Sequence, residues 1–148
     1  MRTLVLDTNV LVSGILSEHG PPGWIVDLVM ARELATAYDS RIIAEYRDVL
    51  ARTELKLSPE RVNRVLFAIQ DAGVLVTPLP WPVALPDADD EPFLASAKAA
   101  GAPLVTGNLR HYPTASRCGV TVLSPRQFLE TLRDRPGGQR GPGAGDMR

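Results

Sequence analysis

Short apolar runs alternate with amphipathic segments along most of the chain. The apolar runs predict buried strands, which we place at 3–6, 34–38, 74–76, 104–106 and 120–123. Apolar residues at helical spacing predict helices between them, which we place at 9–16, 24–29, 39–50, 58–69, 91–101 and from 124 onward. Strands that are short and apolar throughout are typical of a parallel sheet covered on both faces. We therefore predict an α/β fold with three layers, α/β/α, and a short parallel sheet.

Serine and proline residues mark several boundaries of these elements. Ser58 precedes Pro59 at the start of one predicted helix, where the missing amide hydrogen of proline costs little. Ser124 and Gln127 have the spacing of a capping box before the last helix. The segment 78–86 contains four prolines, so it cannot form a regular helix or an inner strand. We interpret it as a spacer.

Composition narrows the class of protein. The chain has 148 residues, of which 45% are hydrophobic and 22% charged, as expected for one soluble domain. Cys118 is the single cysteine, which excludes an intramolecular disulfide and fits a reducing, cytoplasmic location. No apolar run is long enough for a membrane span, and the first residues do not resemble a signal peptide.

Charge is distributed unevenly between the two parts of the chain. The last 16 residues, 133–148, are rich in Gly, Pro and Arg and carry a net charge of +2. Since the whole chain has a net charge of −1, residues 1–132 carry −3. We predict a folded domain at 1–132 and a disordered tail at 133–148.

Polar residues follow three of the predicted strands: Asp7, Asp39 and Asn108. Ligands of open parallel sheets bind beyond the carboxyl ends of the strands, so these positions are candidates for a site. A carboxylate at the end of a buried strand is costly unless it is paired or binds a metal. For Asp7 the alternative is that it only caps the next helix.

Two further acidic segments belong to helices. Glu45 shares a helix face with Ile42 and Val49, which places it at the margin of the buried stripe. The segment 87–91 has four acidic residues in five positions, which repel one another unless a cation or a helix N-terminus neutralises them. Asp90 is placed to project toward the sheet, while Asp87 and Asp89 remain competitors for the same role.

Three separated carboxylates with the amide oxygen of Asn108 form a hard oxygen donor set that suits Mg²⁺ or Mn²⁺. Such ions activate water and neutralise charge on a phosphoryl group. The chain has no nucleophile elbow, no phosphate-binding glycine loop and no evident catalytic triad. The sequence therefore favours metal-dependent phosphoryl chemistry, on a polynucleotide or on a small phosphate ester.

Four motifs resemble the PIN-domain ribonucleases, and specifically the small prokaryotic toxins of the VapC-like subgroup. The motifs are LVLDTNVL at 4–11, DSRIIAE at 39–45, DADDEPFL at 87–94 and LVTGNL at 104–109. The resemblance implies a PIN-like fold with Rossmann-like topology, and a metal-dependent endoribonuclease that belongs to a toxin–antitoxin pair. It also implies Mg²⁺ or Mn²⁺ as the cofactor.

The resemblance assigns roles to individual residues. Asp7 and Asp90 would be metal ligands, with Glu45 a ligand or the holder of the activated water, and all three catalytic. Asp87 and Asn108 are additional candidate ligands. Asn9 and Thr106 would support the ligands by hydrogen bonds, Thr106 to Asp7 in particular.

One position departs from the family pattern, because Asn108 stands where the family usually has an aspartate. An amide offers an oxygen without the charge, so a second metal would bind more weakly. The alternative function is therefore a catalytically weak or inactive PIN-fold protein that binds RNA or another protein.

The resemblance also suggests partners: an RNA substrate, a cognate antitoxin and a second copy of the chain in a homodimer. We predict RNA contacts by Arg41, Arg110 and His111, since phosphate binding is largely electrostatic. Tyr112 is a candidate for stacking on a base. Trp24 is assigned either to a dimer or antitoxin groove or to the core.

Overall fold

Five parallel strands form a sheet in the order β3-β2-β1-β4-β5. The computed structural model describes residues 2–133, and its strands are β1 (Arg2–Leu6), β2 (Leu34–Tyr38), β3 (Val74–Leu75), β4 (Leu104–Val105) and β5 (Val122–Leu123). The helices are α1 (Thr8–Leu16), α2 (Pro21–Met30), α3 (Ser40–Leu50), α4 (Pro59–Ala72), α5 (Glu91–Ala100) and α6 (Pro125–Arg133). Short 3-10 turns add η1 (Thr53–Leu55), η2 (Ala88–Asp90), η3 (Leu109–His111) and η4 (Thr114–Ser116). The predicted tail, apart from Arg133 at the end of α6, lies outside the described residues.

β1 is the central strand and pairs with β2 on one side and β4 on the other. Its residues Leu4, Val5 and Leu6 are completely buried, as expected for a strand covered on both faces. β3 lies at one edge of the sheet and both of its residues are exposed. The residue that follows β1 is therefore placed at the centre of the sheet's carboxyl edge.

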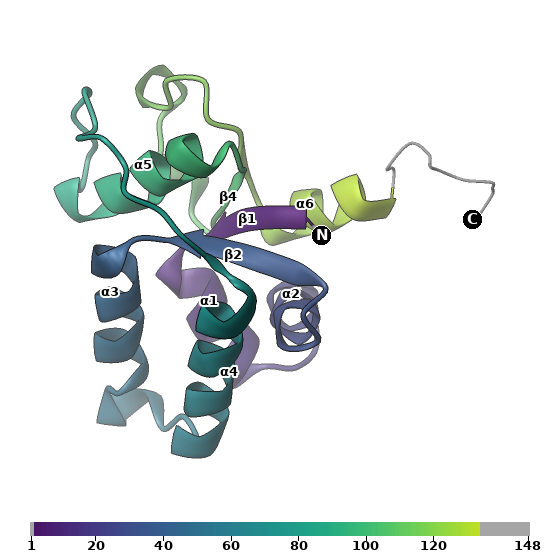
Figure 1. Cartoon of the computed structure of the whole chain (residues 1–148). Coiled ribbons are helices and arrows are strands. Elements are labelled where there is room, and N and C mark those ends of the chain that lie inside the picture. The colour runs from purple at the N-terminus through teal and green to yellow at the C-terminus, as the bar shows by residue number, and fades with distance from the viewer. Residues whose placement is uncertain (1, 134–148) are drawn as a thin grey trace.

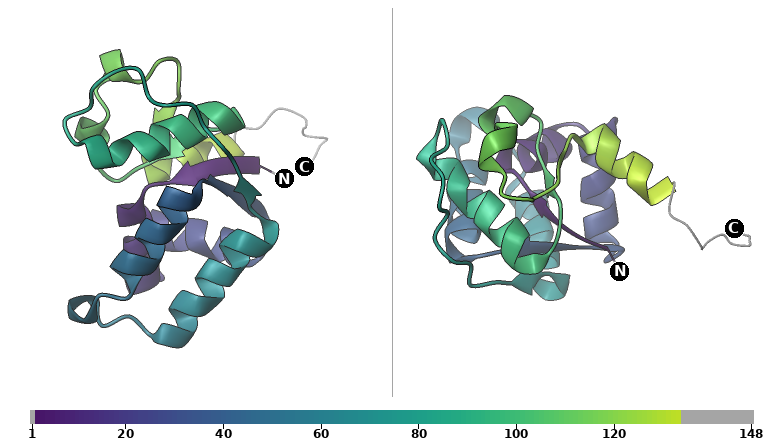
Figure 2. Two further views of the ribbon diagram at one scale, coloured as in Figure 1. Left: turned by 60° about the vertical axis from the view of Figure 1, so that its left-hand side comes forward. Right: turned by 90° about the horizontal axis from the view of Figure 1, so that it is seen from above.

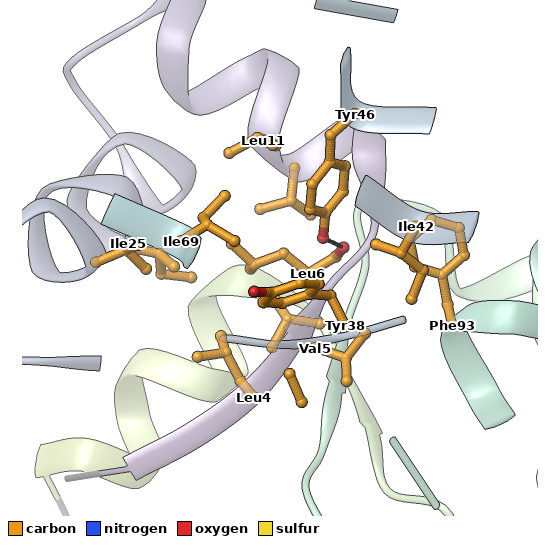
Figure 3. Close-up of a cluster of buried hydrophobic side chains, with 14 of the residues drawn as sticks. Leu4, Val5, Leu6, Leu11, Ile25, Tyr38, Ile42, Tyr46, Ile69 and Phe93 are labelled. Atoms are coloured by element: carbon orange, nitrogen blue, oxygen red, sulfur yellow. Dashed lines mark hydrogen bonds between the residues drawn. The ribbon is translucent and has the colours of Figure 1, made fainter. Parts of the chain in front are cut away.

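Helices cover both faces of the sheet, which confirms the predicted three-layer α/β/α fold (Figure 1). α5 packs on β1 and β2 from one side, and α2 and α4 pack on β2 from the other (Figure 2). In the core, the hydroxyl of Tyr46 donates a hydrogen bond to the carbonyl of Leu6 (Figure 3). This bond ties α3 to the end of β1, next to Asp7.

The local sequence signals at the helix starts are confirmed. Ser124 Oγ accepts from the Gln127 amide at 3.1 Å and Gln127 Oε1 accepts from the Ser124 amide at 2.9 Å, which is the predicted capping box. Ser58 caps α4 in the expected way. The three C-terminal strands are shorter than predicted, and the segment 107–116 contains η3 and η4.

The sequence left two roles open for Trp24, one in a dimer or antitoxin groove and one in the core. Its side chain lies on α2 and is 52% exposed, so a core role is wrong.

Within residues 2–133, every helix is too short or too polar to cross a bilayer.

Candidate functional site

Asp7, Glu45 and Asp90 line one hollow of about 520 Å³ beyond the carboxyl end of β1. Three different elements deliver them, since Asp7 follows β1, Glu45 lies on α3 and Asp90 ends η2. The other residues around the hollow are Thr8, Asn9, Val12, Ser13, Val49, Arg52, Glu54, Leu55, Asp87, Asp89 and His111. Six carboxylates thus face one arginine and one histidine, so the hollow is strongly acidic.

Asp7 is held by two neutral hydroxyl groups. Its Oδ2 accepts hydrogen bonds from Thr106 Oγ1 at 2.8 Å and from the Tyr112 hydroxyl at 3.0 Å. The bond from Thr106 was predicted, and that from Tyr112 was not. Within the described residues the Asp7 side chain makes no capping bond to α1, so the simple cap alternative is wrong.

The surroundings of Asp7 affect its charge. Asp7 is 6% exposed, and this burial raises the pKa of the carboxyl above its usual value. The two hydroxyl bonds, the Thr8 amide and His111 act in the opposite direction. Both hydroxyls bond to Oδ2, so neither uses Oδ1. Asp7 is therefore a buried acid with neutral partners on one oxygen.

Glu45 is positioned by the residue next to Asp7. Thr8 Oγ1 donates a hydrogen bond to Glu45 Oε2. Thr8 is the first residue of α1 and Glu45 lies in the middle of α3, so this bond joins two helices at the edge of the hollow. The predicted position of Glu45 at the margin of the buried stripe is consistent with its intermediate exposure between buried Ile43 and Tyr46.

The acidic segment forms a turn in which the three aspartates have different surroundings. Asp87 is exposed and its Oδ1 accepts from the Asp89 amide at 2.9 Å, so it caps η2. Asp90 is more buried. Its Oδ2 accepts no hydrogen bond from any described residue, although His111 Nδ1 lies 3.1 Å away. α5 begins at Glu91, directly after Asp90 and with Pro92 in its first turn.

The charge of Asp90 is unfavourable in this place. Burial, followed by the negative charge of Asp7, raises the pKa of Asp90 to about 6. His111 acts in the opposite direction but does not cancel these effects. A cation in the hollow would relieve both the burial cost and the repulsion between the two aspartates.

The residues after β4 connect this region to α1. The amide of Asn108 donates to Thr106 Oγ1 at 3.0 Å, and the amide of Gly107 donates to Asn9 Oδ1 at 3.2 Å. Asn9 also lines the hollow, whereas Asn108 is not among its lining residues. The structure therefore brings Asn9 and Thr106 to the predicted place but leaves the Asn108 side chain outside.

The predicted RNA contacts differ in their placement. His111 lines the hollow itself. Arg41 lines two neighbouring hollows and forms an ion pair with Asp39, with 2.6 Å between the nearest atoms. Arg110 is exposed on η3. Tyr112 is completely buried, so the expectation that it stacks on a base is wrong.

Arg52 lines the hollow, and the sequence did not predict this position for it. It lies just after α3, where it donates to Asp48 Oδ2 at 3.4 Å. The segment 51–57 has no pattern that separates this arginine from an ordinary surface residue. Only the fold reveals its proximity to the acids.

The donor set fits a hard divalent cation by its chemistry. It consists of carboxylate oxygens with excess negative charge, one of them buried and without a hydrogen bond. As the side chains stand, no three His, Cys, Asp or Glu residues within 2–133 form a ready metal-binding group. The Glu45 carboxylate bonds to Thr8, and His111 lies beside Asp90 without a hydrogen bond to its Oδ2.

Comparison with known proteins supports the fold and identifies the family. The solved structure of PAE2754 from Pyrobaculum aerophilum superposes with a TM-score of 0.55 at 16% identity, covering 91% of each chain. At that identity the likeness concerns the fold alone. The uncharacterized protein MJ1680 of Methanocaldococcus jannaschii is 26% identical over 138 residues, covering 86% of this chain and 89% of the relative.

The family assignment follows from a match over most of the folded part. A sequence model of the PIN domain matches residues 3–110, which include Asp7, Glu45, Asp90 and Asn108. The same four positions carry the motifs identified in the sequence. The chain therefore belongs to the PIN domain family, whose members are generally nucleases that use divalent metals.

Proposed function

We propose that this protein is a Mg²⁺- or Mn²⁺-dependent endoribonuclease that hydrolyses RNA phosphodiester bonds. The observation that carries the proposal is the convergence of Asp7, Glu45 and Asp90 on one hollow of a PIN fold. Three acids from distant parts of the sequence meet there with little compensating positive charge. Such an arrangement is costly for stability and is expected where a cation binds.

In this proposal the residues around the hollow have three kinds of role. Asp7, Asp90 and Glu45 would hold the ion, which supplies an activated water and neutralises charge on the phosphoryl group. The hydroxyls of Thr106 and Tyr112 orient Asp7, and that of Thr8 orients Glu45. His111 and Arg52 line the same hollow and offer donors to a phosphate.

Among the adjacent acids, the geometry favours Asp90 as the third ligand. Asp87 already accepts the Asp89 amide and both of these residues are exposed. Asp90 has a buried oxygen without a hydrogen bond and lies close enough to Asp7 for their charges to interact. Asn108 lies outside the hollow, which favours a single metal held by the other three residues.

Cleavage of a labelled RNA oligonucleotide in the presence of Mn²⁺ tests this proposal. We expect Asp7→Asn and Asp90→Asn to reduce the rate at least about a hundredfold, because each removes a charged ligand. Asp71→Asn is the matched control, since Asp71 is an exposed acid that pairs with Arg32 and does not line the hollow.

The control shows whether a loss of cleavage is specific to the acids of the hollow, because Asp71→Asn removes the same charge outside the hollow. Equal cleavage by wild type and by the Asp7→Asn, Asp90→Asn double variant would contradict the proposal. Binding of RNA without cleavage at any Mn²⁺ concentration would favour the alternative, an inactive RNA-binding protein. Hydrolysis of small phosphate esters but not of RNA would indicate a phosphatase.

We further propose that the protein is the toxin of a type II toxin–antitoxin pair, a homodimer that acts in the cytoplasm. The support is the resemblance of the four motifs to that subgroup and the exposure of Trp24 on α2. Expression of the wild type is expected to arrest growth, and Asp7→Asn to relieve the arrest. Growth arrest by the inactive variant would oppose the toxin assignment and leave the nuclease proposal intact.

A further inference from the structure

Two consecutive residues at the end of η3 contact the two central aspartates. The Tyr112 hydroxyl donates to Asp7 Oδ2 at 3.0 Å, and His111 Nδ1 lies 3.1 Å from Asp90 Oδ2. Asp7 and Asp90 belong to different elements and are 83 residues apart in the sequence. Residues 111–112 thus form a short bridge between them.

The bridge is held firmly by its own backbone. The amides of His111 and Tyr112 donate to the carbonyls of Asn108 and Leu109, at 3.1 and 3.0 Å. The Tyr112 carbonyl in turn accepts from Arg117 Nε at 2.8 Å. A change at either side chain therefore acts on a compact turn rather than on a loose loop.

The two side chains differ in exposure in a way that matches their partners. Tyr112 is completely buried and reaches the buried Asp7, whereas the His111 side chain is 44% exposed and reaches Asp90 at the wall of the hollow. A buried tyrosine hydroxyl needs a partner, and here that partner is a carboxylate. A structural role in packing alone would need neither the hydroxyl nor the imidazole nitrogen.

We infer that Tyr112 and His111 are positioning residues that fix Asp7 and Asp90 relative to each other. The inference rests on the proposed function for what the two acids do, and on the contacts above for how they are placed. It also gives the segment after β4 a role that does not depend on a charge at Asn108. The segment contributes a hydroxyl and an imidazole to the site instead of a fourth acid.

Crystal structures of metal-free variants test the placement directly. In Tyr112→Phe, we expect the Asp7 carboxylate to change its orientation while Asp90 stays in place, because only the bond to Asp7 is lost. In His111→Ala, we expect Asp90 to move while Asp7 stays. In His111→Asn, whose amide nitrogen can occupy about the place of Nδ1, Asp90 should keep its orientation.

Calorimetric titration with Mn²⁺ tests the consequence. Tyr112→Phe and His111→Ala are each expected to weaken binding about tenfold, as for other groups that orient metal ligands. His111→Asn should restore most of the affinity. Tyr38→Phe is the matched control, since Tyr38 is also a buried tyrosine and the hydroxyls that bond to Asp7 are those of Thr106 and Tyr112.

The outcomes separate this inference from the proposed function. Unchanged orientations of Asp7 and Asp90 in the two variants, or affinities within twofold of Tyr38→Phe, would overturn the inference. Absence of Mn²⁺ binding by the wild type would instead contradict the proposed function, and the metal-free structures would still decide the positioning role. Loss of affinity with no rescue by His111→Asn would count against His111.

Discussion

Asp7 and Asp39 occupy corresponding places in the fold, yet their side chains have different partners. Each follows a strand of the inner sheet, β1 or β2, and each is the residue before a helix. Asp39 Oδ1 accepts from the Ile42 amide at 2.9 Å, and its Oδ2 pairs with Arg41. Asp7 makes no such cap in the described residues, and its Oδ2 accepts from the hydroxyls of Thr106 and Tyr112.

The neighbouring strand accounts for this difference. β1 lies beside β4, and the chain after β4 supplies Thr106 and Tyr112. β2 lies beside the short edge strand β3, so Asp39 relies on the helix that follows it and on Arg41. Hydroxyls orient a carboxylate without neutralising it, whereas a helix N-terminus and an arginine offset its charge. Of the two aspartates, Asp7 is therefore the one whose ionised form a cation would stabilise more.

The largest expected effect of this difference concerns stabilisation by metal. A ligand that binds only the folded state at a hundred times its Kd adds about 2.7 kcal/mol of stability. We expect Mn²⁺ at such a concentration to raise the Tm of the wild type and of Asp39→Asn. The Tm of Asp7→Asn should not respond. Thermal unfolding followed by circular dichroism, with and without Mn²⁺, measures the three responses.

Asp39→Asn is a suitable partner for this comparison because asparagine also caps helices well. The variant keeps the cap of α3 and loses only the charge that faces Arg41. If Asp39→Asn lost the response to Mn²⁺ as Asp7→Asn does, the two aspartates would not differ in the way their hydrogen bonds indicate.

A smaller effect concerns pH in the absence of metal. The pKa of Asp90 is raised to about 6, so the folded state holds a proton that the unfolded state releases near the ordinary aspartate pKa of 3.8. This contribution is present below about pH 4 and is lost as the pH rises through 6. We expect metal-free Asp90→Asn to be more stable than the wild type at pH 7, by about 1–2 kcal/mol.

Urea unfolding at several pH values between 4 and 7 measures this difference. The advantage of Asp90→Asn should shrink toward pH 4, where Asp90 is protonated in the folded state and about half protonated in the unfolded state. Mn²⁺ competes with that proton, so its stabilising effect on the wild type should grow from pH 5 to pH 7. An advantage of Asp90→Asn that is independent of pH would contradict an electrostatic origin.

Asp7 also illustrates which features of this protein can be predicted from the sequence and which cannot. The helices, the parallel sheet and the capping box of α6 follow from local patterns of a few residues. The partners of Asp7 do not follow from local patterns, because Thr106 and Tyr112 are 99 and 105 residues away. The family resemblance predicted the bond from Thr106, but nothing in the sequence predicted the bond from Tyr112. Tyr112 lies in a polar segment, and nothing local indicates that the fold buries it completely.

The sequence predicts the acidic residues of the site only in part. Their order along the chain matches the PIN motifs, which predicts that Asp7, Glu45 and Asp90 share one site. The distinction between Asp87 and Asp90 depends on the η2 turn, where one caps and the other is partly buried. Side chains with identical chemistry differ here only through the geometry of three residues.

The smallest expected effect tests whether Arg41 serves Asp39 alone or also the substrate. Arg41 is exposed, whereas Asp39 is buried and keeps the hydrogen bond from the Ile42 amide, so Arg41→Ala should lower the stability by about 1 kcal/mol. Arg32→Ala removes a more accessible ion pair with Asp71, whose residues do not line the hollow, and serves as the control for the loss of one surface arginine. Fluorescence anisotropy with a single-stranded RNA, in the non-cleaving Asp90→Asn background, measures affinity at several salt concentrations. If Arg41 contacts a phosphate, its removal lowers the slope of log affinity against log salt by about 0.7. Equal slopes for Arg41→Ala and Arg32→Ala would assign Arg41 to Asp39 alone.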